Sequence, residues 1–295
     1  MQKHQLYLVD ASIYIFRAYF SMPDSIRDKN GNPCNALYGY TLFLLQLIQR
    51  HGPTHIAVAF DESLTSSFRN KIYPDYKANR ELPPDDLALQ MRRCKKVTEM
   101  LGLACYSSKK YEADDLIGSI ANKMRKRCKM VYVTADKDLL QLMQPGDEML
   151  NFAKDYSVNF REVKKHIGVK ASQVIDLLAL MGDAVDNIPG ATGIGKKTAT
   201  ALLEAYKGVD DIYARLSSVA DMELRGARGI MTKLESSRQL VEISYQLASI
   251  VEDAPIEANL SLLKRQSNDT DALCRYLDSL RFSRTISNRV RSILD

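Results

Sequence analysis

The sequence predicts a doubly wound α/β domain with a mainly parallel sheet, followed by a helical second half. In the first half, short apolar runs alternate with longer helix-like stretches, and three of the apolar runs end in aspartate. Past Met149 the strand signals weaken and helical segments punctuated by glycine follow. A length of 295 residues allows one large domain or two unequal ones.

Four strands are expected in the first half, with helices between them and after them. The strand candidates are Leu6 to Asp10, His55 to Asp61, the run around Leu103 to Tyr106, and Met130 to Asp136. The clearest helical candidates are residues 36–50, 88–101, 113–127, 172–181, 196–206 and 238–251. Parallel strands end at one edge of a sheet, where open sheets bind ligands, so we expect Asp10, Asp61 and Asp136 there.

The same pattern predicts three regions. They are an α/β core over residues 1–180, which includes a basic segment at about 64–110, a helical region over 181–260, and a helical tail over 261–295.

Composition excludes several classes of protein. No run of about 18 apolar residues and no secretory signal is visible, so no membrane association and a cytoplasmic location are expected. The five cysteines form no CxxC pair, which argues against a disulfide framework or a cysteine zinc site. A net charge of +5 is only a weak hint of a polyanionic partner. Bases dominate residues 65–110, with ten Lys or Arg against five Asp or Glu, whereas residues 111–118 carry acids and no base.

Acidic residues recur at strand ends and loop starts. Any one of them is explained more simply as a helix cap or a first-turn acid. Together they would repel, by roughly 4 kcal/mol for two charges about 4 Å apart at an effective dielectric near 20. Bases of the basic segment or divalent cations could neutralise them, and oxygen ligands without His or Cys favour Mg²⁺ or Mn²⁺. More carboxylates than one ion needs imply two ions and phosphodiester hydrolysis. The acids are Asp10, Asp61, Glu112, Asp114, Asp115, Asp136, Asp138, Asp183 and Asp186.

A glycine-rich turn reads GATGIGKKT over residues 190–198. It is not a P-loop, because Lys197 stands where Ser or Thr is needed and no strand precedes it. We expect a tight turn between two helices, in which backbone N–H groups and two lysines hold a phosphate. An ordinary turn with solvated lysines is the alternative. The residues concerned are Gly190, Gly193, Gly195, Lys196 and Lys197.

In the basic segment, cationic and aromatic residues alternate, which is the composition of a single-strand binding surface. A helix here would project Lys77 and Arg80 in one direction, with Pro74 at its first position. The alternative is a solvated loop. The alternating residues are Phe68, Arg69, Lys71, Tyr73, Tyr76, Lys77 and Arg80.

Six motifs covering most of residues 5–210 appear in a specific order. They are LVDASIYIFRAYF (8–20), AVAFD (57–61), FRNKIYPDYKANR (68–80), YEADDLIG (111–118), VYVTADKDLLQL (131–142) and GDAVDNIPGATGIGKKTA (182–199). In this order they resemble the flap endonuclease family of 5′-nucleases, most closely the 5′ to 3′ exonuclease domain of bacterial DNA polymerase I. The resemblance implies a PIN-like nuclease core, a helical arch and a helix-three-turn-helix region.

The resemblance also implies roles for individual residues. Lys77 and Arg80 match cations that assist at the scissile phosphate, with Asp114 and Asp186 among the catalytic carboxylates. Arg17 matches a basic position close to the active site, and Tyr76 matches an aromatic position that stacks near the scissile phosphate. The turn at Gly190–Gly195 matches a duplex grip that commonly binds K⁺. Arg69, from the composition of the basic segment, is also expected to contact DNA. Asp10, Asp61, Glu112, Asp114 and Asp115 match the first metal, and Asp136, Asp138, Asp183 and Asp186 match the second.

The departures from the family pattern are small. Ala135 stands where glycine is usual, Ala184 or Val185 where serine is usual, and Thr192 where proline is usual. None removes a ligand, so they bear on rate and duplex affinity more than on activity.

The hypothesis is therefore a monomeric, structure-specific 5′-nuclease that uses two Mg²⁺ ions, with Mn²⁺ as a substitute. It would cut DNA flaps, nicks and 5′ overhangs, leaving a 5′-phosphate and a 3′-hydroxyl, in coupling with a polymerase and a ligase. The chain fits a free-standing nuclease or the nuclease part of a larger polymerase. The alternatives are a non-catalytic DNA-junction-binding protein and an RNA-directed hydrolase.

Overall fold

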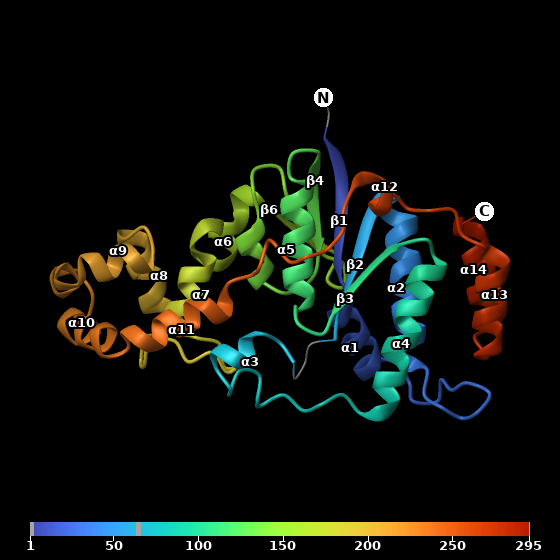
Figure 1. The fold of residues 1–295 in the computed structure, drawn as a ribbon, viewed down its shortest axis with the longest axis horizontal. Helices are drawn as coiled ribbons and strands as arrows, with labels where there is room; N and C mark the ends of the chain where they lie inside the picture. The colour runs from blue at the N-terminus through green and yellow to red at the C-terminus, as the bar shows by residue number, and fades with distance from the viewer. Residues whose placement is uncertain (1–2, 63–65, 295) are drawn as a thin grey trace.

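A six-stranded sheet forms the centre of the computed structural model, which describes residues 3–62 and 66–294 (Figure 1). Residues 64 and 65, where the basic segment was predicted to begin, lie outside this description. The strand order is β3-β2-β1-β4-β5-β6, parallel throughout except for the β5–β6 edge pair. The strands are β1 (His4–Asp10), β2 (His55–Asp61), β3 (Ala104–Ser108), β4 (Cys128–Val133), β5 (Glu148–Asn151) and β6 (Tyr156–Asn159).

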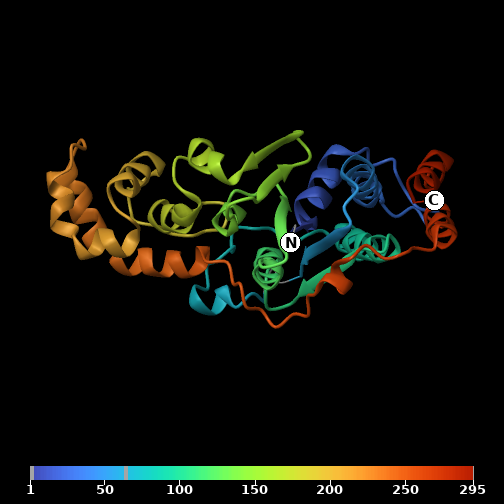
Figure 2. The same ribbon diagram turned by 90° about the horizontal axis from the view of Figure 1, so that it is seen from above.

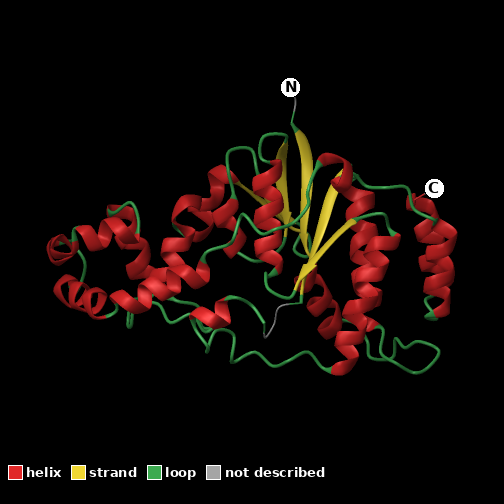
Figure 3. Cartoon of the chain, in the orientation of Figure 1, coloured by secondary structure: helices red, strands yellow, loops and turns green. Residues whose placement is uncertain are grey.

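Helices surround this sheet and then form the second half of the chain (Figure 3). Those of the first half are α1 (Ala11–Ser21), α2 (Asn35–His51), α3 (Arg69–Ile72), α4 (Asp85–Met100) and α5 (Ala113–Met124). Those that follow β6 are α6 (Val163–Ile167), α7 (Val174–Met181), α8 (Lys196–Ala205), α9 (Val209–Ala214), α10 (Ala227–Ser236), α11 (Arg238–Ala248), α12 (Leu260–Leu263), α13 (Thr270–Ser279) and α14 (Arg284–Leu294). Short 3-10 helices are η1 (Asp138–Leu142), η2 (Phe160–Glu162), η3 (Ala171–Gln173) and η4 (Leu216–Asp221).

The four predicted strands and six predicted helices are confirmed with small shifts at their ends. β5 and β6 were missed, because each has only four residues and β6 is polar on most positions. One local prediction is wrong: the segment that carries Lys77 and Arg80 is not a helix. It forms successive turns, with hydrogen bonds such as that from the Arg80 amide to the Lys77 carbonyl (3.0 Å). Lys77 has a φ of 56°, which interrupts any right-handed helix.

The sheet is buried on both faces, as expected for parallel strands covered by crossover helices. Alternate residues of β1 enter different cores: Leu6 and Leu8 pack with α5 on one face, whereas Tyr7 and Val9 pack with α1 and α2 on the other. Residues of α13 and α14, such as Leu277, complete the second core beside α2 and α4.

The molecule is elongated, with α8 to α10 at one end and α13 and α14 at the other (Figures 1 and 2). α11 runs from the α8–α10 end toward the sheet, where the chain continues alongside α5. No helix within the described ranges is both long and apolar enough to span a bilayer.

Candidate active site

Acidic side chains collect at the carboxyl edge of the sheet. β1 lies between β2 and β4, so strand order reverses beside β1, and such a switch point opens a crevice in an α/β sheet. Asp10 ends β1, Asp61 ends β2, and Asp136 lies in the loop after β4. The expected convergence of these three strand ends is therefore found.

Hydrogen bonds fix two of these carboxylates. One oxygen of Asp10 accepts the amide of Ser12 (3.1 Å) and so caps α1, while the other accepts the Thr134 hydroxyl (3.3 Å). The same hydroxyl oxygen accepts the amide of Asp136 (3.0 Å), whose carboxylate accepts the amide of Asp138 (2.9 Å). The sequence pattern did not single out Thr134, although it links the end of β1 to the loop after β4.

A third group of acids comes from the first turn of α5. Glu112 is the N-cap, and Asp114 and Asp115 follow it, where a helix dipole favours negative charge. Asp115 accepts the amide of Glu112 (3.0 Å), which closes a capping box.

The last two acids lie in the loop after α7, and this loop is joined to the basic segment. The amide of Lys77 donates to the carbonyl of Asp186 (3.0 Å), and the side chain of Asn79 donates to the carbonyl of Ala184 (2.8 Å). In return, the Asn187 side chain donates to the carbonyl of Asp75 (2.6 Å). Backbone contacts therefore hold the predicted catalytic cations against this acidic loop.

These groups enclose a cavity of about 440 Å³. Its lining combines acidic side chains, apolar side chains and two cations of the basic segment. The lining residues include the acids Asp10, Asp61, Glu112, Asp114, Asp136 and Asp186, the apolar residues Ile13, Phe16, Pro83 and Met91, and the cations Lys77 and Arg80. Asp138 and Asp183 are outside this lining but act on the same acids electrostatically.

Some of the acids have partners from the protein itself, and we call these the compensated acids: Glu112, Asp115 and Asp186. The Lys77 ammonium lies 2.6 Å from a Glu112 oxygen and 3.6 Å from an Asp186 oxygen, and Arg80 also pairs with Asp186. Burial alone would raise the pKa of Glu112, but the charges of Lys77 and Arg69 lower it below the ordinary value.

Four others, the uncompensated acids, have no ion-pair partner within 4 Å among the residues that the structure describes. They are Asp10, Asp114, Asp136 and Asp138. Burial and the charges of neighbouring carboxylates raise the pKa of Asp10 to about 7 and that of Asp138 to about 8. The same two causes raise the pKa of Asp114 well above its ordinary value. Mutually repelling, buried carboxylates of this kind favour a cationic ligand.

The donor chemistry of the uncompensated acids fits hard divalent cations, which bind carboxylate oxygens without His or Cys. Among residues 3–62 and 66–294, no three His, Cys, Asp or Glu side chains form a ready-made metal centre. The fit therefore rests on the type and charge of the donors and on their shared cavity.

Arg69 does not have the position of a DNA contact that the sequence predicted. It is only 2% exposed, and its guanidinium donates to both Asp115 oxygens (2.7 and 2.8 Å). Since both oxygens of the fully buried Asp115 are bound by this cation, the geometry does not support its predicted role as a metal ligand either. Tyr76 is also buried, and its hydroxyl donates to Glu112 (3.2 Å), so its ring is not available to stack on a base in this conformation.

The predicted duplex-binding residues lie elsewhere on the molecule. Lys196 and Lys197 are exposed at the start of α8. Gly190 has a φ of 64°, and a Cβ there would lie 2.3 Å from the amide of Gly182, so only glycine fits this turn. Arg17 is exposed on α1 and lines a separate cavity, of about 340 Å³, rather than the acidic one.

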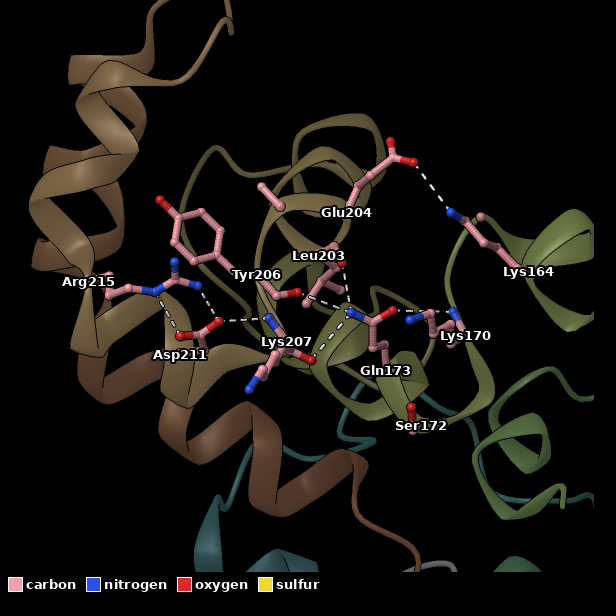
Figure 4. Close-up of a pocket in the computed structure, with 12 residues that line it drawn as sticks. Lys164, Lys170, Ser172, Gln173, Leu203, Glu204, Tyr206, Lys207, Asp211 and Arg215 are labelled. Atoms are coloured by element: carbon pink, nitrogen blue, oxygen red, sulfur yellow. Dashed lines mark hydrogen bonds and ion pairs between the residues drawn. The ribbon is translucent and has the colours of Figure 1, made fainter.

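A larger cavity, of about 730 Å³, lies between η3, α8 and α9 (Figure 4). Both of its acidic side chains are paired with cations: Asp211 with Arg215, and Glu204 with Lys164 (3.3 Å). Figure 4 shows Gln173 directed at the end of α8, where it donates to the carbonyl of Leu203 (2.7 Å). Because no repelling carboxylates remain here, this cavity lacks the chemistry of the acidic one.

An α/β sheet with clustered carboxylates at its switch point, covered by a cationic segment, defines the class of acid-lined phosphodiester hydrolases. The chain belongs to the 5′-3′ exonuclease family. The family model of the N-terminal resolvase-like domain matches residues 5–168, and that of the C-terminal SAM fold matches residues 169–271.

A relative of similar length and a much longer relative both agree with this assignment. The chain is 34% identical to a 5′-3′ exonuclease of Buchnera aphidicola, over 86% of this chain and 89% of that protein. It is 35% identical to DNA polymerase I of Pseudomonas aeruginosa over 99% of this chain, which spans about a third (32%) of that polymerase.

Solved structures share the fold at low identity. T5 D15 protein, co-crystallised with metal ions, has a TM-score of 0.69 at 19% identity and covers 99% of this chain and 100% of its own. The catalytic core of Rad2 in complex with DNA substrate has a TM-score of 0.64 at 14% identity, with 99% and 92% covered. The predicted family, the nuclease class and the α/β core followed by a helical region are thus confirmed. The predicted boundaries at residues 180 and 260 stay predictions.

Proposed function

We propose that this chain is a structure-specific 5′-nuclease that hydrolyses phosphodiesters of DNA flaps, nicks and 5′ overhangs with two Mg²⁺ ions, which Mn²⁺ can replace. The observation that carries the proposal is the set of buried, mutually repelling carboxylates at the switch point of the sheet. DNA as the substrate is supported by the solved structures of T5 D15 flap endonuclease with DNA and metal ions and of the catalytic core of Rad2 with DNA substrate.

The proposed metal ligands form two groups, one for each ion. Bound ions would supply positive charge that stabilises the negative charge developing on the phosphate during hydrolysis. The first group is Asp10, Asp61, Glu112 and Asp114, and the second is Asp136, Asp138, Asp183 and Asp186.

Cationic side chains of the protein would bind and orient the phosphate. In the structure Lys77 forms an ion pair with Glu112, and Arg80 forms one with Asp186. A phosphate that enters would exchange these contacts for its own oxygens, so both cations would orient it. The apolar lining residues, Phe16 among them, would help to exclude water from the cavity.

Duplex DNA would be held at the glycine turn, by Lys196, Lys197 and the free amides at the start of α8. K⁺ at Gly190–Gly195 stays a prediction, and the carbonyl of Gly193 already accepts a hydrogen bond from the ammonium of Lys233 (3.3 Å). Arg17 would contact DNA outside the cavity. We also propose a monomeric, cytoplasmic enzyme that acts with a polymerase and a ligase.

A labelled 5′-flap DNA tests the proposal. Wild-type protein should cut it with Mg²⁺ or Mn²⁺ and leave a 5′-phosphate, whereas Asp114→Asn and Asp186→Asn should lose at least about 10²- to 10³-fold in kcat. Both variants should still bind the flap in EDTA, with affinity that falls steeply with salt. Asp211→Asn, which removes a carboxylate from the paired cavity, is the control and should cut normally.

Absence of cleavage by the wild type, with binding intact, would identify a non-catalytic junction-binding protein instead. Preference for an RNA flap over the DNA flap would overturn the choice of substrate.

A further inference from the structure

The buried guanidinium of Arg69 joins three segments that are far apart in sequence. Beyond its two bonds to Asp115 in α5, its Nε donates to the carbonyl of Leu247 (2.8 Å) and its Nη2 to that of Ser249 (2.7 Å). Asp115 in turn accepts the amide of Val251 (2.9 Å). Arg69 therefore connects the base of the basic segment, the start of α5 and the end of α11.

The carbonyls that Arg69 binds are those that a helix leaves without partners at its last turn. Between them, the carbonyl of Ala248 accepts the side chain of Gln141 (3.1 Å), whose oxygen accepts the amide of Ile250 (3.1 Å). Gln141 belongs to η1, which begins at Asp138. The end of α11 is thus fixed both to the segment that carries Asp114 and to the segment that carries Asp138.

The same helix holds the glycine turn. The hydroxyl of Ser244 accepts the amide of Gly190 (2.8 Å), and that of Ser237 accepts the amide of Thr192 (3.2 Å). Figure 2 shows α11 running from the end of the molecule that carries α8 and α10 toward α5. One helix therefore contacts the proposed duplex grip and, through Arg69, the acids of the cavity.

We propose that Arg69 is a positioning residue that sets the carboxylates at the start of α5 relative to the duplex-binding turn, with Asp115 as its partner rather than as a metal ligand. The proposal rests on the proposed function, because it assigns the alignment of that same site. Arg69 acts through Asp115, which closes the capping box on Glu112, and through its own longer ion pair with Glu112 (4.0 Å); it does not touch DNA.

The shape of the guanidinium is what this position requires. Its planar fork binds a carboxylate in two places and still directs N–H groups at the carbonyls of Leu247 and Ser249, at the end of α11. A lysine keeps the charge but carries a single ammonium, so it cannot hold Asp115 and both carbonyls in one geometry. Arg69→Lys consequently tests alignment without removing the charge.

Three variants of the whole chain test the proposal: Arg69→Lys, Asp115→Asn and the double variant. The matched control is Arg125→Lys. Arg125 pairs with Asp147 and donates to the carbonyl of Leu142 (2.8 Å), but it lies at the other end of α5. This control variant shows how much the disruption of an arginine–aspartate pair lowers stability when the pair lies away from the proposed site.

Mn²⁺ binding without DNA, followed by calorimetry, is the first measurement, and flap cleavage is the second. Arg69→Lys and Asp115→Asn should each weaken Mn²⁺ binding about 5-fold or more and lower kcat about 10-fold or more, with flap affinity in EDTA within about 2-fold of wild type. The double variant should resemble the single ones, because both changes break one unit. Arg125→Lys should lower the unfolding temperature and leave Mn²⁺ binding and kcat unchanged.

Effects of Arg69→Lys and Asp115→Asn that multiply in the double variant would overturn the proposal. So would normal Mn²⁺ binding and kcat in a folded Arg69→Lys protein, or equal losses in Arg125→Lys. Loss of Mn²⁺ binding in Asp115→Asn with normal binding in Arg69→Lys would return Asp115 to the metal ligands. Failure of the proposed function itself is distinguishable, since wild-type protein would then fail to cut the flap while the Mn²⁺ comparison among variants still stands.

Discussion

The compensated and uncompensated acids share one cavity but differ in what balances their charge. Lys77, Arg80 and Arg69 neutralise Glu112, Asp186 and Asp115. The four uncompensated acids have no ion-pair partner among the described residues, and the distant charge of Lys77 offsets only part of their mutual repulsion. The chain therefore supplies its own cations on the side of the basic segment and leaves the switch point of the sheet negative. That difference identifies the switch point as the place where an added cation would stabilise the fold most.

The largest expected effect is that substitutions in the two groups of acids change the free energy of unfolding in opposite directions. Asp10→Asn removes a repelling charge but keeps the oxygen that caps α1, so in EDTA near pH 8 it should stabilise the protein by about 2–4 kcal/mol. Glu112→Gln removes the nearer of the two carboxylates that pair with the buried Lys77 ammonium and should destabilise the protein by about 2–4 kcal/mol. Both variants should lose cleavage. Urea unfolding measures the first effect and the flap assay the second.

The two variants serve as controls for each other, because each removes one carboxylate charge from the same cavity. Unfolding free energies that shift in the same direction would contradict the division of the acids into two groups.

The second effect is a pH dependence of the metal-free protein. The folded-state pKa values of Asp10, about 7, and Asp138, about 8, lie above the ordinary aspartate value near 3.9, so the folded protein binds these protons more tightly than the unfolded chain does. The stability that these protons supply is complete below about pH 4 and is lost as pH rises through 7 and 8. We expect a loss of about 2–4 kcal/mol between about pH 5.5 and about pH 9 in EDTA.

Excess Mg²⁺ should remove most of this loss, because cations replace the protons at the carboxylates. Urea unfolding at both pH values, with and without Mg²⁺, provides the measurement. A metal-free stability that rises over this interval would mean that the raised pKa values are wrong.

The third effect concerns Lys77, which is the main counter-charge of the compensated acids. Lys77→Met should lower kcat by about 10²-fold, raise the pKa of Glu112 and destabilise the protein by about 1–3 kcal/mol. Lys123→Met, on the exposed surface of α5, is the control. A normal kcat in a folded Lys77→Met protein would remove Lys77 from the proposed machinery.

Sequence periodicity predicted the sheet and the edge at which Asp10, Asp61 and Asp136 meet, because strand direction follows from local apolar runs and chain order. It could not predict which acids are compensated. That property depends on side chains from remote segments, such as Arg69 with Asp115, or Lys77 with Glu112.

Local composition was misleading where tertiary contacts decided the outcome. In the sequence, Arg69 and Tyr76 lie near Lys71 and Tyr73 and so resemble surface residues. In the structure both are buried by contacts with α5. The expected helix around Lys77 gives way to turns, because this segment bonds to the loop at Asp186 rather than to itself alone. Nothing in the sequence indicated that Thr134 binds Asp10 or that Gln141 binds Ala248, since each pair is separated by more than a hundred residues.

The smallest effect separates the two cations of the basic segment. The side chain of Arg80 is 39% exposed, against 9% for Lys77, so solvent already screens its pair with Asp186. Arg80→Met should therefore change the unfolding free energy by less than about 0.5 kcal/mol, while kcat falls about 10-fold because the guanidinium is still directed at the cavity. Urea unfolding and flap cleavage, measured beside Lys77→Met, check this order. A stability loss larger than that of Lys77→Met would show that the exposed cation, rather than the buried one, holds the basic segment on the acids.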